Sequence, residues 1–126
     1  MIKANELRIG NLIYLKHGGN GYKLHFVSKS TINNYSNDKY DFIMPIPINE
    51  EILLRLGFEK SFKNDYWYSI RFGDKRLLVS ILGNVEIEKW DRTMIGFFSI
   101  CEYVHQLQNL YFALCGEELV FFSTEP

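Results

Sequence analysis

The sequence has few cysteines and no long run of hydrophobic residues, and each shortage excludes a class of protein. Only two cysteines occur among 126 residues, Cys101 and Cys115. A helix between them would separate their Cα atoms by about 21 Å, whereas a disulfide needs about 7 Å or less. We therefore expect free thiols and a cytoplasmic protein. No apolar run approaches the roughly 20 residues that span a bilayer, and the N-terminus lacks the apolar core of a signal peptide, so we expect no membrane partner.

An excess of charge is also missing. The chain has 14 lysines and arginines against 15 aspartates and glutamates. Strong non-specific binding of nucleic acid usually accompanies a basic excess, so this balance argues against it, although a local basic face stays open. What the chain does have is apolar material. Hydrophobic residues make up 47% of the chain and aromatic residues 16%, enough to fill the core of a single domain over residues 1–126.

The first third of the chain predicts β structure. Asn11–Leu15 is a short apolar run, and the segment 22–28 alternates, with Tyr22, Leu24 and Phe26 on one face. Glycine and asparagine between these segments favour a turn. Together they predict a β-hairpin or a small-barrel part.

The middle of the chain predicts a loop, a soft boundary and a short helix. The polar segment 30–39 indicates an exposed loop or a weak edge strand. Pro45 and Pro47 favour extended backbone and mark a soft subdivision of the single domain. Asn49 then predicts a helix N-cap, and Gly57 predicts the end of that helix.

An antiparallel β-meander is predicted next. Gly73-Asp74 is typical of a two-residue hairpin loop. This loop predicts three cross-strand pairs that share one core face: Ile70 with Leu77, Tyr68 with Val79, and Tyr66 with Ile81. For the following turn, a two-residue loop at Gly83-Asn84 would put Glu86 on that face. We favour a three-residue loop, Gly83–Val85, because it puts Ile87 there and avoids burying a carboxylate.

The end of the chain predicts a strand, a helix and a short final strand. Thr93–Ile100 is an apolar run that favours a strand, and Leu119–Phe122 predicts another. Between them, apolar residues recur at helical spacing over Tyr103–Leu114 and stop at Gly116. That stripe consists of Val104, Leu107, Leu110, Tyr111 and Leu114, and it leaves Gln106, Gln108 and Asn109 largely off it. We predict an α+β fold in which this C-terminal helix packs on the sheet.

No stretch of the sequence carries a specific catalytic, metal or cofactor signature. Glu102 and His105 have the Glu-x-x-His spacing of di-iron bundles, which require two such pairs; a histidine on the helix surface or in a hydrogen bond is the favoured interpretation. Glu86 and Glu88 share a strand face and favour a solvated surface over acid–base chemistry. Cys101 and His105 lie four apart but lack a third, orienting group. We assign no catalytic and no metal-binding residues and expect no cofactor.

The most suggestive surface is the second face of the predicted 66–82 hairpin. Trp67, Arg71 and Arg76 fall on it, and Lys75 lies at the turn. The predicted register sets Arg71 directly opposite Arg76, and an anionic partner would relieve that repulsion. An aromatic ring beside arginines can stack a base and hold a phosphate. The alternative is that Trp67 packs inward and the arginines pair with nearby carboxylates.

Several strings in the chain resemble a group of short uncharacterised proteins encoded by gut-bacterial genomes, their prophages and mobile elements. They are Glu6–Asn11 (ELRIGN), Pro45–Pro47 leading into Glu50-Glu51, Leu53–Phe58 (LLRLGF) and above all Tyr103–Leu119 (YVHQLQNLYFALCGEEL). The resemblance implies an accessory protein of phage type, whose products commonly bind host or defence components.

These observations leave three hypotheses of function. The first is a non-catalytic binding protein with a protein partner, either a host or defence component or a second copy in a homo-oligomer. The second is a nucleic-acid or nucleotide binder that uses the Trp67/Arg71/Arg76 face. The third, a small enzyme, has the least support in the sequence.

Overall fold

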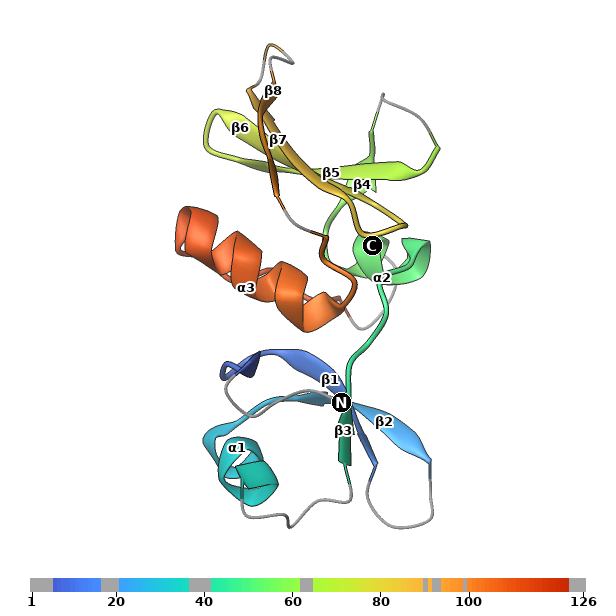
Figure 1. Cartoon of the computed structure of the whole chain (residues 1–126), viewed down its shortest axis with the longest axis vertical. Coiled ribbons are helices and arrows are strands. Elements are labelled where there is room, and N and C mark those ends of the chain that lie inside the picture. The colour runs from blue at the N-terminus through green and yellow to red at the C-terminus, as the bar shows by residue number, and fades with distance from the viewer. Residues whose placement is uncertain are drawn as a thin grey trace. The chain divides into compact units, whose positions relative to one another are not determined.

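The computed structural model describes residues 6–16, 21–36, 42–61, 65–89, 91, 94–98 and 100–122 (Figure 1), with the side chains of 34–36, 42, 94, 97 and 98 left aside. The fold is α+β, as predicted, with two antiparallel sheets and a C-terminal helix that bonds to the first strand. In chain order the elements are β1 (Leu12–Lys16), β2 (Tyr22–Phe26), α1 (Lys29–Ser36), β3 (Phe42–Met44), α2 (Glu50–Arg55), β4 (Glu59–Lys60), β5 (Trp67–Phe72), β6 (Lys75–Ser80), β7 (Val85–Lys89), β8 (Met94–Phe98) and α3 (Val104–Cys115).

The chain forms two compact units. Unit 1 comprises Met1–Pro47 and Tyr103–Asn109, and unit 2 comprises Ile48–Glu102 and Leu110–Pro126. One boundary between the units therefore follows Pro47, beside the soft subdivision that the sequence predicts. That the chain is a single domain stays a prediction. No helix in the described part of the chain is long and apolar enough to cross a membrane.

Unit 1 contains a three-stranded sheet in the order β2-β1-β3. Ile13 and Ile43 are fully buried on one face of this sheet, where they form a core with Leu7 and Val27. Ile32 of α1 packs against the same cluster. Apolar burial on this one face holds the helix to the sheet.

The prediction of a loop or weak strand over 30–39 is wrong where the structure describes it, because α1 occupies Lys29–Ser36. Two hydroxyl side chains cap this helix reciprocally. Ser28 Oγ accepts a hydrogen bond from Thr31 N at 3.2 Å, and Thr31 Oγ1 accepts one from Ser28 N at 3.1 Å. This capping compensates for the low helix propensity of the polar segment. Residues 37–39 lie outside the described part.

The first half of α3 binds β1 through a buried amide. Gln108 is 1% exposed. Its Oε1 accepts a hydrogen bond from Leu12 N at 2.7 Å, and its Nε2 donates one to Gly10 O at 3.3 Å. The sequence pattern set Gln108 off the buried stripe, and the structure corrects this: the side chain is buried because it satisfies two backbone groups of another segment.

Unit 2 contains a five-stranded sheet in the order β4-β5-β6-β7-β8. Its β5–β6 hairpin confirms the predicted register, since Ile70 faces Leu77 and Tyr68 faces Val79. Beyond the paired strands, Ile81 N donates to Tyr66 O at 2.9 Å. Tyr66 was expected in the core but is 59% exposed, because it lies at the open end of the hairpin.

The next turn differs from both loops that the sequence suggested. Val79 faces Val85, so the chain reverses at Ile81–Gly83. Ile87 therefore faces Leu77, four residues away from Ile81, the partner that the favoured loop predicted. Ser80 closes this turn, because its Oγ accepts hydrogen bonds from the backbone N–H groups of Leu82 and Asn84 at 3.2 and 3.1 Å. Ile87 still shares a face with Leu77, since a shift by an even number of residues preserves the side on which a side chain lies.

The helix ends were predicted well. Asn49 caps α2 and accepts from Ile52 N at 2.9 Å. After α2, Gly57 has a φ of 89°, and Phe58 N donates to Leu53 O at 3.0 Å, as in a Schellman motif. Gly116 follows α3 with a φ of 74°. The final segment 119–122 is not a strand; it is held instead by a bond from Phe122 N to Arg55 O at 2.8 Å.

Candidate functional site

The face that the sequence singled out lies on β5 and β6. Trp67 is half-buried, Arg71 is exposed, and Arg71 faces Arg76 directly in the sheet, as the register predicted. Lys75 faces Phe72 instead and therefore lies on the opposite side of the sheet from Arg71 and Arg76. The structure thus brings three of the four predicted residues to one face.

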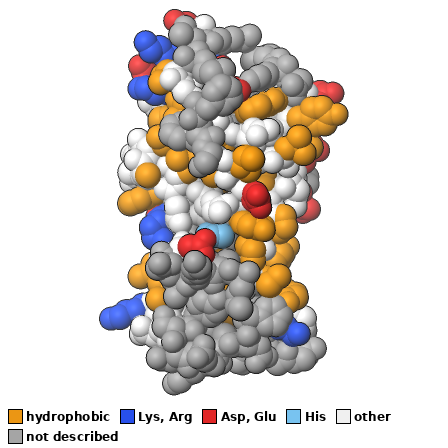
Figure 2. All heavy atoms as spheres, viewed as in Figure 1, with side chains coloured by type: hydrophobic (Ala, Val, Ile, Leu, Met, Phe, Trp, Pro, Cys, Tyr) orange, Lys and Arg blue, Asp and Glu red, His pale blue; other side chains and the backbone are white. Residues whose placement is uncertain are grey.

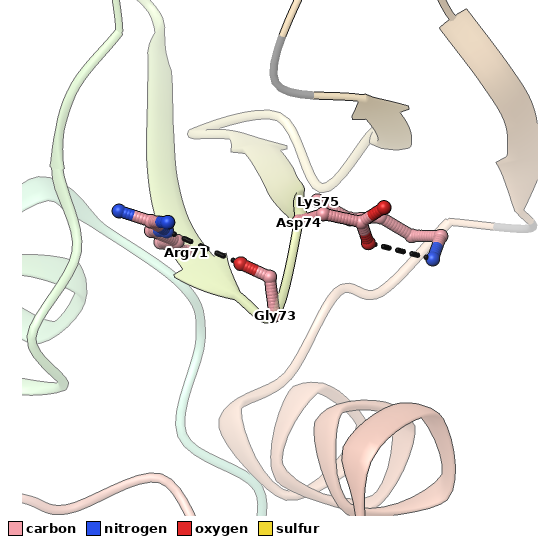
Figure 3. Close-up of polar contacts among 4 residues, drawn as sticks. All are labelled: Arg71, Gly73, Asp74 and Lys75. Atoms are coloured by element: carbon pink, nitrogen blue, oxygen red, sulfur yellow. Dashed lines mark hydrogen bonds and ion pairs between the residues drawn. The ribbon is translucent and has the colours of Figure 1, made fainter.

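The cations of this hairpin make contacts within unit 2. Arg76 Nη1 lies 2.7 Å from Glu88 Oε1, and both side chains are largely buried. Arg71 Nε donates to Gly73 O at 3.2 Å, and Lys75 Nζ lies 3.0 Å from Asp74 Oδ1. Figure 3 shows the Arg71 and Lys75 side chains pointing in opposite directions. The repulsion between the paired arginines is therefore offset by Glu88 inside the sheet, and anion binding here stays a prediction.

The acidic pair on β7 is not a solvated surface. Glu86 faces Leu78 and is 5% exposed, and Glu88 faces Arg76. The carboxylates are shielded from solvent because this part of the sheet is buried on both faces. Leu78 and Ser80 are also buried on the face that carries Arg76.

His105 is the least expected polar residue of the molecule. It lies in the first turn of α3, is 2% exposed, and neither ring nitrogen has a hydrogen-bond partner among the described residues. Its ring stacks on Tyr103 with centroids 6.1 Å apart. The expectation of a surface or hydrogen-bonded histidine is therefore wrong. Burial lowers the pKa of His105 below its usual range, and the Glu6 carboxylate opposes that shift.

We expect this histidine to make folding sensitive to acid. Its pKa is lower in the folded than in the unfolded chain, so the unfolded chain binds more protons below pH 7. The free energy of unfolding then falls as the pH is lowered through about 6.5, and this fall ends once the folded-state pKa is passed. Urea denaturation at several pH values between about 8 and about 5 measures this change in the free energy of unfolding. His105→Leu should flatten the profile, whereas an unchanged slope would refute the assignment.

The other chemical candidates do not assemble into a reactive site. Both cysteines are free thiols, as predicted. Burial raises the pKa of the Cys101 thiol, the opposite of the shift that activates a nucleophilic cysteine. Across the described residues, no three His, Cys, Asp or Glu side chains gather as metal ligands would.

An exposed apolar surface lies on β2, and the sequence did not identify it as a site. Tyr22, Leu24 and Phe26 share one side of this strand and are 44%, 43% and 53% exposed. We call these three side chains the β2 apolar face. They stand opposite Lys16, Tyr14 and Leu12 of β1. The alternation of the sequence predicted the shared side, but no sequence signal shows whether that side is covered.

Tyr22 of the β2 apolar face contacts a neighbouring ring and a cation. Tyr14 and Tyr22 have ring centroids 6.3 Å apart, and Lys16 Nζ lies 5.9 Å from the centre of the Tyr22 ring. These contacts position Tyr22 while leaving much of its surface exposed. Large side chains exposed together on one strand are typical of a protein-binding surface.

Figure 2 shows lysines, arginines and carboxylates dispersed among exposed hydrophobic side chains on the visible face.

Comparisons of the chain with protein-family models, with curated proteins and with solved structures gave no match.

Proposed function

We propose that this protein is a non-catalytic binding protein that engages a protein partner through the β2 apolar face. The observation that carries the proposal is the joint exposure of Tyr22, Leu24 and Phe26 on one side of a strand. Water contact with this much apolar surface is unfavourable, and a partner that covers it gains the corresponding hydrophobic free energy. We propose no enzymatic activity and no cofactor.

The resemblance to proteins of prophages and mobile elements supports a host or defence component as the partner. Free thiols support a cytoplasmic setting. Both points belong to the proposal, and a second copy of the chain is an alternative occupant of the same surface.

A nucleic-acid or nucleotide binder is the second candidate function. The observation in its favour is the pairing of Arg71 with Arg76 beside the half-buried Trp67. The ion pair between Arg76 and Glu88 weakens it, because Glu88 already supplies an anion to this face.

A capture experiment with matched variants separates the two functions. The tagged protein is incubated with lysate of a host cell, and both protein and nucleic acid in the captured fraction are identified. We expect a captured protein that Leu24→Asp loses and that Leu82→Asp retains, since Leu82 is an equally apolar but 74% exposed residue of unit 2. Retention by Leu24→Asp would refute the proposal. Captured nucleic acid that Arg71→Glu releases would favour the second candidate.

A further inference from the structure

We propose that β2 accepts an extended segment of the partner as an additional strand, and that this segment alternates apolar with acidic residues. The inference rests on the proposed function and specifies its partner. Its starting point is the position of β2 at the edge of the described three-stranded sheet, in the order β2-β1-β3. Proteins commonly bind extended peptides by adding a strand at such an edge.

The backbone of β2 is oriented for this pairing. Val27 N donates to Asn11 O at 2.8 Å, which directs the backbone of Val27 towards the chain of β1. Backbone polar groups alternate in direction along a strand, so those of Leu24 point to the opposite, outer side. The Leu24 backbone is therefore directed at an incoming strand, and its side chain lies in the centre of the β2 apolar face.

The side chains of β2 specify what an incoming strand must carry. On one side of the sheet it would meet Tyr22, Leu24 and Phe26 in turn, which favours apolar partners. On the other side it would meet Lys23, which is exposed, and His25, whose Nε2 lies 2.8 Å from Thr31 Oγ1. An acidic residue opposite Lys23 makes a favourable cross-strand pair. The segment therefore alternates apolar and acidic positions.

The charge of unit 1 favours the same partner. Its described residues include four basic side chains and one acidic side chain, namely Arg8, Lys16, Lys23, Lys29 and Glu6. Two of the lysines, Lys16 and Lys23, belong to the paired strands β1 and β2. An acidic segment is attracted to such a surface, and a basic segment is repelled.

A second copy of the chain fits this edge less well. Antiparallel pairing of β2 with itself, centred on Leu24, would match the apolar residues, since Tyr22 would face Phe26. It would also place the Lys23 side chains of both copies on the same side of the joined sheet, as diagonal neighbours across the new strand pair. Like charges brought together oppose association.

The test uses synthetic peptides of about nine residues, long enough to cover β2 with a margin at each end. One alternates valine with glutamate, and a control alternates valine with lysine. We expect the valine–glutamate peptide to bind the full chain and the control to bind more weakly. Lys23→Glu should weaken the glutamate peptide by about threefold to tenfold and favour the lysine peptide. Lys60→Glu, on the exposed edge strand β4 of unit 2, is the matched control and should change neither.

Methylation of the peptide backbone tests the strand pairing itself. Methyl groups on alternate amide nitrogens give two peptides, and only one set of amides faces β2. We expect one methylated peptide to lose binding and the other to keep it. Equal effects of the two methylation patterns on binding would overturn the pairing of the peptide with the edge of β2. Binding of the lysine peptide that equals or exceeds that of the glutamate peptide would overturn the proposal that the partner segment is acidic. A dimer seen by sedimentation and abolished by Leu24→Asp would overturn it in favour of a second copy.

Failure of this inference and failure of the proposed function give different results. If neither peptide binds but Leu24→Asp still loses the captured lysate protein, only the strand-addition inference fails. If Leu24→Asp retains that protein as well, both fail.

Discussion

Gly83→Ala is expected to lower the free energy of unfolding by about 2–5 kcal/mol. Gly83 has a φ of 91°, a conformation that costs an L-residue free energy. A Cβ at this position would also lie 2.7 Å from the Cys101 carbonyl oxygen and 2.9 Å from Ile100 Cγ2. The carbonyl belongs to the backbone and is fixed by the bond from Cys101 N to Gly83 O at 2.8 Å, so it cannot move aside easily.

Gly73→Ala is the matched control for this substitution. Gly73 also lies in a turn of unit 2 and has a positive φ of 59°, but a Cβ there would meet nothing within 4 Å. It should cost roughly 1–2 kcal/mol, the conformational part alone. Urea denaturation of the unaltered protein, Gly83→Ala and Gly73→Ala measures the free energy of unfolding that each variant loses. Equal losses in the two variants would contradict the close packing of Gly83 against Cys101.

Gln108→Leu is expected to lower the free energy of unfolding by about 2–4 kcal/mol. The leucine side chain has nearly the same size but can neither accept from Leu12 N nor donate to Gly10 O. Leu12 N and Gly10 O would then lose their hydrogen-bond partner. Gln108 is only 1% exposed, so the site that they share with it is buried. A buried polar group without a partner costs more than the average hydrogen bond contributes.

Gln106→Leu makes the same chemical change two residues away in α3. Gln106 is half-buried, and its Oε1 accepts from Tyr103 N at 3.2 Å at the start of the helix. Loss of such a cap costs about 1 kcal/mol. Thermal or urea unfolding compares the two variants, and a loss at Gln106 as large as that at Gln108 would show that the buried amide has no special role.

Local chemistry accounts for the parts of the fold that the sequence predicted correctly. The Gly73-Asp74 loop is short enough to fix the register of β5 and β6, and the apolar alternation of both strands agrees with it. Asn49 and Gly116 mark helix ends because capping needs only neighbouring residues.

Distant contacts account for the parts that the sequence did not predict. The turn at Ile81–Gly83 depends on the Ser80 hydroxyl and on Cys101, which is far from it in the chain. Gln108 is buried because its partners, Leu12 and Gly10, lie at the other end of the sequence. Helical periodicity identifies an apolar stripe but does not show which polar residue meets an unsatisfied backbone group.

The candidate site was predicted only in part. The sequence placed Arg71 opposite Arg76 correctly, but it could not show that Arg76 pairs with Glu88, because that contact depends on the register of β7. It also placed the β2 side chains on one side of a strand. Whether a side of a sheet is covered depends on the packing of other elements, and alternation alone carries no information on that packing.

The most direct test of the account is a nuclear magnetic resonance titration of the isotope-labelled protein with the valine–glutamate peptide. The binding surface proposed here predicts that the amide signals of Tyr22–Phe26 shift the most and that the Leu24 amide becomes protected from hydrogen exchange. Signals that change only at Arg71–Arg76 would contradict the proposed binding surface. It would also be contradicted if no signal changes and the Leu24→Asp variant still captures the lysate protein.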